Sequence, residues 1–171
     1  MKKNNTKGIV LGGIIAALYT VLTYFAAMLN LANGAIQVRF SEALTILPVF
    51  TPWAIPGLAI GCFLGNLLTP NVAPLDLWLG PAATLIGAVG TWLLKKCPRI
   101  AWIPPVVSNA VIIPFVLMKG YGIDNVELFG QTLYGWPILA VTVGIGEIIS
   151  CGILGMLIYA SLKKTNVLER I

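Results

Sequence analysis

Long apolar segments alternate with short polar ones along the whole chain. The apolar segments cover residues 8–31, 42–50, 56–68, 77–94, 101–118 and 137–162. A helix needs roughly 20 consecutive apolar residues to cross a bilayer, and most of these segments approach that length. The pattern therefore predicts an all-α integral membrane protein with six transmembrane helices, formed as one domain over residues 1–171.

Two segments depart from this regular pattern. Residues 42–50 form a short apolar stretch that stops at Thr51 and Pro52, which predicts a kinked or half-spanning second helix. Residues 119–134 form the longest polar connection and contain three glycines, so we expect a loop that includes a surface turn.

The composition supports the membrane class. Hydrophobic residues make up 58% of the chain and charged residues only 10%, with a mean hydropathy of +0.91, whereas soluble domains carry about 25% charged residues. The first apolar segment is too long for the roughly 7–15-residue apolar core of a cleaved signal peptide. We therefore expect it to remain as a membrane helix.

Basic residues fall mainly on one side of the six-helix arrangement. They are Lys2, Lys3, Lys7, Lys95, Lys96, Arg99, Lys163, Lys164 and Arg170, whereas Arg39 and Lys119 fall on the other side. Because cytoplasmic connections carry the excess of Lys and Arg, both termini of a multi-pass plasma-membrane protein are predicted to be cytoplasmic. The net charge of +5 then follows from topology, and no nucleic-acid partner is expected.

Several kinds of chemistry are not expected. The three cysteines lie in predicted spans or in a cytoplasmic connection, so we expect no disulfide. The chain has no histidine, the usual general base and commonest metal ligand, and it has no nucleotide-binding loop or nucleophile motif. The sequence therefore predicts neither an enzyme nor a metal site, and no cofactor in this chain.

Ionisable residues inside or beside the spans are the strongest functional signal, because charge in a bilayer costs free energy unless it is paired, hydrated or bound to a ligand. Glu147 lies about ten residues into the last segment, roughly 15 Å deep and near the middle of the bilayer. Arg39, Ser41 and Glu42 stand between two apolar segments. The structural alternatives are a protonated, hydrogen-bonded Glu147 and a local Arg39–Glu42 ion pair with Ser41 as helix cap.

Further polar and aromatic residues are expected at the outer half of the bundle. They are Asn109, Asn66, Asp76, Trp78, Trp136 and Phe40. With the ionisable residues they make a candidate binding site for a small molecule. Individually, Asn66 and Asp76 are also typical of helix caps, and the two tryptophans are typical of interface anchors.

Three runs of sequence resemble one transporter family. They are residues 37–48, Gln-Val-Arg-Phe-Ser-Glu-Ala-Leu-Thr-Ile-Leu-Pro; residues 57–67, Gly-Leu-Ala-Ile-Gly-Cys-Phe-Leu-Gly-Asn-Leu; and residues 76–84, Asp-Leu-Trp-Leu-Gly-Pro-Ala-Ala-Thr. The chain resembles the QueT family of queuosine-precursor permeases, substrate-binding S components of energy-coupling factor (ECF) transporters. The resemblance implies an S-component-like bundle that captures a deazaguanine base, such as preQ0 or preQ1, from outside. It also implies a transmembrane coupling subunit and two cytoplasmic ATPase subunits, which would hydrolyse the ATP.

Small residues at helical spacing are expected to allow close helix approach. Glycines recur at positions 57, 61 and 65 of the third segment. The first segment carries Gly12, Gly13, Ala16, Ala17 and Thr20, where S components commonly have an Ala-x-x-x-Ala pattern that docks on the coupling subunit. The alternative for these residues is packing within the same chain.

The candidate residues suit the ligand that the resemblance implies. A carboxylate, Glu147 or Glu42, can accept the two adjacent donors of a guanine-like face. Asn109 or Asn66 can donate to the ring carbonyl, while a tryptophan or Phe40 stacks on the base. A second carboxylate would suit an aminomethyl ammonium, and the two glutamates are not assigned between these roles. We further expect residues 30–41 to cover the ligand as a loop.

Other functions remain open. The chain is also compatible with an S component for another vitamin-like or base ligand. It is compatible too with an autonomous ion-coupled transporter in which Glu147 binds a proton or cation, although no convincing internal repeat supports that mechanism. An intramembrane enzyme has the least support.

Overall fold

The computed structural model describes residues 2–29, 38–128 and 130–165. Its α-helices are α1 (Lys2–Met28), α2 (Ala54–Leu68), α3 (Asp76–Leu93), α4 (Ile103–Gly120), α5 (Trp136–Glu147) and α6 (Gly155–Thr165). Two 3₁₀ helices, η1 (Phe40–Val49) and η2 (Pro98–Ile100), a π-helix, η3 (Ile148–Leu154), and two strands, β1 (Asn125–Leu128) and β2 (Gln131–Tyr134), complete the fold. Residues 30–37 of the expected covering loop lie outside the described residues.

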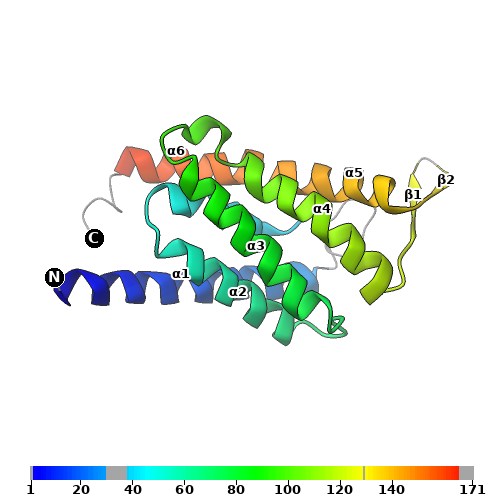
Figure 1. Cartoon of the computed structure of the whole chain (residues 1–171), viewed down its shortest axis with the longest axis horizontal. Helices are drawn as coiled ribbons and strands as arrows, with labels where there is room; N and C mark the ends of the chain where they lie inside the picture. Colours follow the sequence, from blue (N-terminus) through cyan, green and yellow to red (C-terminus); the bar gives the residue numbers. More distant parts are fainter. Residues whose placement is uncertain (1, 30–37, 129, 166–171) are drawn as a thin grey trace.

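The helices form an elongated bundle (Figure 1). Three helical stretches, Asn5–Met28, Pro98–Gly120 and Trp136–Thr165, are long and apolar enough to cross a membrane. This agrees with the predicted all-α membrane class, while the count of six spans and the side of the termini stay predictions. The third stretch is continuous because α5, η3 and α6 follow one another without a break.

One end of the bundle collects basic side chains. The start of α1, the connection between α3 and α4 and the end of α6 lie at this end, and the β1–β2 hairpin lies at the other (Figure 1). Lys7, Lys95, Lys96, Arg99, Lys163 and Lys164 belong to these three segments. The distribution is that expected for a cytoplasmic end.

The polar connection at residues 119–134 is more ordered than predicted. The expectation of a loop is wrong for Asn125–Leu128 and Gln131–Tyr134, which form two antiparallel strands that pair Val126 with Leu133. Gly130, at a φ of 77°, supplies the left-handed backbone that the tight turn requires. Val126 is buried against the α4–α5 core, whereas the other side chains described in the two strands are exposed or half-buried.

The short second apolar segment folds as η1. All residues from Ser41 to Pro48 are buried, as expected for a helix surrounded by other helices on every side. At ten residues, η1 is too short to cross a bilayer, in line with the half-spanning helix that the sequence predicts. It thereby carries Ser41 and Glu42 into the interior of the bundle.

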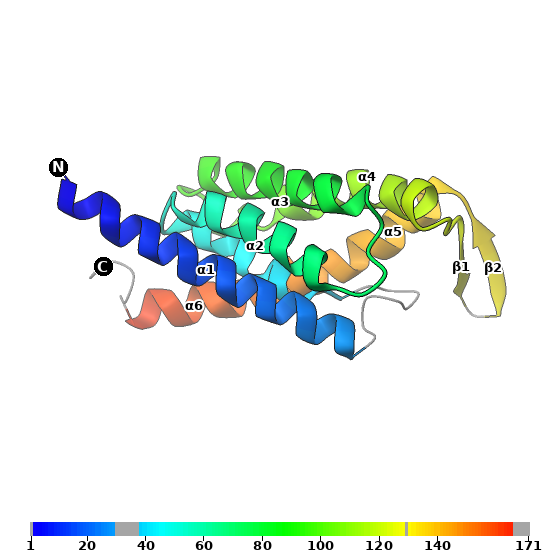
Figure 2. The ribbon, with the colours of Figure 1, turned by 90° about the horizontal axis from the view of Figure 1, so that it is seen from below.

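Small residues let α1 and α2 pack backbone to backbone (Figure 2). A Cβ added at Gly57 would lie 2.5 Å from the carbonyl oxygen of Gly12, and one at Gly61 would lie 2.8 Å from that of Ala16. The hydroxyl of Thr20 adds a 3.2 Å hydrogen bond to the carbonyl of Gly61. The close approach predicted from the glycine spacing is therefore confirmed.

This packing divides the stripe of small residues that was expected to dock a partner. Gly12 and Ala16 are buried and Thr20 is half-buried, all against α2, so these three residues take the alternative arrangement, packing within the same chain. Gly13 and Ala17 point away from the bundle and are exposed. Of these five small residues, Gly13 and Ala17 are the two that are exposed to another subunit.

We predict that Gly57→Ala destabilises the protein. The added methyl group collides with the α1 backbone, and overpacking of this kind typically costs about 1–3 kcal/mol. Gly13→Ala is the matched control, because no atom lies within 4 Å of its added Cβ and both changes gain the same helix propensity. The melting temperature of the detergent-purified protein should fall for Gly57→Ala alone, and equal melting temperatures would contradict the proposed contact.

Candidate functional site

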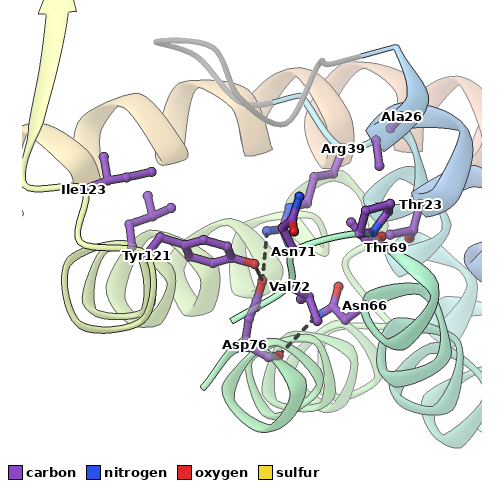
Figure 3. Close-up of a pocket in the computed structure, with 13 residues that line it drawn as sticks. Thr23, Ala26, Arg39, Asn66, Thr69, Asn71, Val72, Asp76, Tyr121 and Ile123 are labelled. Atoms are coloured by element: carbon purple, nitrogen blue, oxygen red, sulfur yellow. Dashed lines mark hydrogen bonds and ion pairs between the residues drawn. The ribbon is translucent and has the colours of Figure 1, made fainter. Parts of the chain in front are cut away.

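A cavity of about 360 Å³ lies at the end of the bundle opposite the basic end. The last turns of α1 and α2, the turn before α3, the start of α3 and the end of α4 line it (Figure 3). Its polar side chains are Thr23, Arg39, Asn66, Thr69, Asn71, Asp76 and Tyr121. We call this space the outer cavity.

Asp76 organises the polar side of the outer cavity. It is buried in the first turn of α3, where the helix dipole favours negative charge. The hydroxyl of Tyr121 donates to Asp76 Oδ2 at 3.0 Å, and Asn66 Nδ2 donates to the Asp76 carbonyl at 3.0 Å (Figure 3). Arg39 Nη2 lies 3.9 Å from Oδ2. Asp76 Oδ1 is buried and has no hydrogen-bond partner.

The charge of Asp76 affects its two neighbours. Burial, followed by the field of the Asp76 carboxylate, raises the pKa of Tyr121 to about 12, so its hydroxyl remains a donor at neutral pH. Burial alone would lower the pKa of Arg39, but Asp76 and other acidic neighbours more than offset this and raise it. Both groups therefore keep the protonation state that suits an ionised carboxylate.

A second polar group, the inner cluster, lies deeper in the bundle and centres on Glu42, which is fully buried. The hydroxyl of Tyr19 donates to Glu42 Oε1, and Thr84 Oγ1 lies 3.5 Å from the same oxygen. Glu42 Oε2 has no hydrogen-bond partner. One carboxylate oxygen is thus tied to α1 and α3, and the other is unused.

Glu147 approaches Glu42 from α5. It is the last residue before the π-helix η3, and the thiol of Cys151 donates to Glu147 Oε2 at 3.2 Å. One donor atom each of Glu42, Glu147 and Cys151 lies within 4.8 Å of the others, so by distance alone this group could also hold a metal ion. Asn109 lies beside both carboxyl groups, and its Nδ2 makes no hydrogen bond of standard geometry with either of them.

The outer cavity and the inner cluster are adjacent. Thr23 lines the cavity, and its hydroxyl donates at 2.9 Å to Ser41, the residue before Glu42. Arg39 is the basic side chain within reach of Asp76, Glu42 and Glu147 in the described part of the chain. Three buried carboxylates therefore share one guanidinium, and the region is poor in positive charge.

The structure brings together most of the residues singled out from the sequence. Arg39, Asn66 and Asp76 line the outer cavity, whereas Glu42, Glu147 and Asn109 form the inner cluster. Arg39 pairs with Asp76, 37 positions away, and not with Glu42 as local helical spacing suggested.

The three aromatic candidates lie elsewhere. Phe40 is half-buried at the start of η1 and does not line the outer cavity. Trp78 is 72% exposed and rests against Phe63, and Trp136 is 40% exposed at the start of α5. The two tryptophans are therefore placed as surface side chains of the described structure.

Sequence reasoning missed two tyrosines. Tyr19 lies on the inner face of α1, and its helical spacing from Ala16 and Thr23 could have identified it as part of one buried face. Tyr121 follows the last turn of α4, and no local signal links it to Asp76 because the contact joins residues distant in the chain.

Comparisons with known proteins give a consistent result. A family model described as QueT transporter matches residues 9–164. The queuosine precursor transporter QueT of Lactococcus lactis subsp. cremoris (strain MG1363) is 36% identical over 86 residues, which cover 50% of this chain and 50% of that protein. The match thus spans about half the length of this curated relative. No solved structure matches the chain.

Proposed function

This chain belongs to the QueT transporter family, and from that premise we propose that it binds a queuosine precursor, a deazaguanine base, as the substrate-capture subunit of an ATP-driven importer. The name of the relative from Lactococcus lactis supports the ligand class. The buried polar groups, and the absence of histidine from the sequence, favour recognition over catalysis.

One observation carries the choice of ligand. Within the inner cluster, neither Glu42 Oε2 nor Asn109 Nδ2 makes a hydrogen bond of standard geometry, although the two side chains are neighbours. Leaving buried polar groups unpaired typically costs about 1–3 kcal/mol each. A guanine-like face offers two adjacent donors and one carbonyl acceptor, so it would satisfy both groups together.

The two glutamates take different roles in this proposal. Glu42 has a free oxygen for the base, while an oxygen of Glu147 already accepts the thiol of Cys151. We assign Glu42 to the ring N–H and the exocyclic amine, and Glu147 to the ammonium of an aminomethyl substituent. An ammonium group beside Glu147 would favour the ionised form of its buried carboxyl group.

The proposal also includes a coupling subunit and two ATPase subunits. Gly13 and Ala17 form a smooth, exposed strip on α1, and small residues of this kind allow a second helix to approach closely within a membrane. This strip lies about 100° around the helix axis from Gly12 and Ala16, which are buried against α2. A partner could therefore dock on α1 without disturbing the bundle.

We expect Glu42→Gln to weaken binding of preQ1 by at least about tenfold. The amide replaces a carboxylate oxygen with a donor that opposes a donor on the base, and hydrogen bonds to charged groups are worth about 1.5–3 kcal/mol. Calorimetric titration of the purified protein measures the change. Glu127→Gln, on the exposed strand β1, is the control and should bind normally. Unchanged affinity in Glu42→Gln would remove Glu42 from the site.

Glu147→Gln separates the two carboxylates. It should reduce affinity for preQ1, which carries an ammonium, by about tenfold, because it removes a charged partner. Affinity for preQ0, whose nitrile is neutral, should change little. An equal loss for both ligands would mean that Glu147 contacts the base itself, and no loss for either would make it a structural residue.

Ala17→Leu should abolish uptake while leaving ligand binding intact. The larger side chain would block close helix approach on the outer face of α1, whereas Ala160→Leu on the exposed face of α6 serves as the control. Uptake is measured in vesicles that contain the coupling and ATPase subunits. Uptake by this chain without those subunits would instead favour an ion-coupled transporter, with Glu42, Glu147 and Cys151 as its cation site.

A further inference from the structure

We propose that the connection between α3 and α4 is a binding site for an anionic phospholipid headgroup. The site is formed by three exposed cations, Lys95, Lys96 and Arg99, which we call the basic turn. It lies at the basic end of the bundle, opposite the outer cavity (Figure 1). The inference concerns a different ligand and does not depend on the proposed function.

The first argument is charge without compensation. Three cations fall between positions 95 and 99, and no acidic residue occurs between positions 77 and 123 of the sequence. None of the acidic side chains that the structure describes forms a salt bridge with the basic turn. Like charges this close in the chain repel one another unless an anion lies among them. The basic turn therefore favours a ligand that brings negative charge.

The second argument is the kind of side chain that surrounds the cations. Leu93 is 68% exposed and Ile100 is 46% exposed. Trp92 and Trp102 are half-buried, and tryptophan is typical of the interface between membrane and water. The basic turn thus combines charged groups with apolar side chains that suit acyl chains. A phospholipid offers a partner for both in one molecule, whereas a soluble anion offers only charge.

The third argument is that the backbone of the basic turn is held in place. The hydroxyl of Thr91 donates to the carbonyl of Ala101 at 2.8 Å, and both residues are fully buried. This bond ties the end of α3 to the residue that follows η2. A Cβ added at Gly90 would collide with Pro104, so the two helices approach closely beside the turn. The connection therefore keeps its cations together on one short, fixed segment.

The two tryptophans also fix individual groups of the basic turn. The indole N–H of Trp102 donates to the carbonyl of Arg99 at 2.9 Å. Lys95 Nζ lies 4.5 Å from the centroid of the Trp92 ring, which is a cation–π contact. The cations are thus placed before a lipid arrives, and this lowers the entropic cost of binding.

The experiment is a titration of the detergent-purified protein with dioctanoyl-phosphatidylglycerol, followed by native mass spectrometry. The tightest-bound lipid is the quantity measured. Wild type should bind it at least about tenfold more tightly than dioctanoyl-phosphatidylcholine, whose headgroup has no net charge. This preference should shrink as the ammonium acetate concentration rises, because salt screens exposed charges.

The triple variant Lys95→Gln/Lys96→Gln/Arg99→Gln should lose the preference. Its affinity for the phosphatidylglycerol should fall by at least about tenfold, because the attraction of basic residues to anionic lipids grows with their number. Its affinity for the phosphatidylcholine should change little. The melting temperature of the variant, measured in the same detergent, shows whether it is folded.

The control removes the same charge from other helices at the same end of the bundle. It changes three exposed lysines at the start of α1 and the end of α6, as Lys7→Gln/Lys163→Gln/Lys164→Gln. This variant has the same net charge as the first but keeps the basic turn. It should therefore retain the preference for the anionic lipid.

Three outcomes would overturn the lipid site. One is equal affinity of the wild type for the two lipids, a comparison that needs no folded variant. Another is an equal loss in the two triple variants, which would reduce the effect to general charge. The third is normal lipid binding by the basic-turn variant together with lost uptake in vesicles that contain the coupling and ATPase subunits. That result would assign the basic turn to a protein partner.

Discussion

The carboxyl group of Glu42 is the point at which the helical elements of this membrane protein are tied together. Its side chain accepts a hydrogen bond from Tyr19 on α1 and lies beside Thr84 on α3, while its backbone carbonyl lies 3.4 Å from the sulfur of Cys151 on η3. In water such bonds would contribute little, but in a dry interior an unsatisfied carboxyl group is costly. The position of η1 is therefore fixed by polar contacts as much as by its apolar side chains.

The scarcity of positive charge distinguishes this interior from an ordinary buried ion pair. Arg39 faces Asp76 directly and influences Glu42 and Glu147 from a greater distance. Removing one partner of a buried pair would leave a buried charge without compensation.

The sequence predicted the class of fold and most of the polar residues, because both follow from rules that act locally. Charge is rare in an apolar chain, so Arg39, Glu42, Asp76 and Glu147 were identifiable by type alone. The partners of these residues could not be identified from the sequence, since the Arg39–Asp76 and Tyr121–Asp76 contacts join segments far apart in the chain. Periodicity describes neighbours on one helix and carries no information on which helices meet.

Two other differences lie between the sequence prediction and the structure. The β1–β2 hairpin was missed although its strands contain Val126, Leu128, Leu133 and Tyr134, because the glycines and polar residues around them indicated a loop. The small residues of α1 were identified correctly, but the sequence could not assign them to an inner and an outer face. That assignment needed the position of α2, whose glycines contact the backbone at Gly12 and Ala16.

The backbone contact between α1 and α2 has a consequence for how freely this helix can change its sequence. Tyr19, which holds Glu42, lies on the same face as Gly12 and Ala16, so any side chain that pushes α1 away from α2 also withdraws the hydroxyl from the carboxylate. Helix packing and the hydrogen bond to Glu42 are thus coupled on this face, and substitutions there act on both at once. In a library of random variants, the tolerated changes in α1 should accumulate on the opposite face, apart from the strip at Gly13 and Ala17.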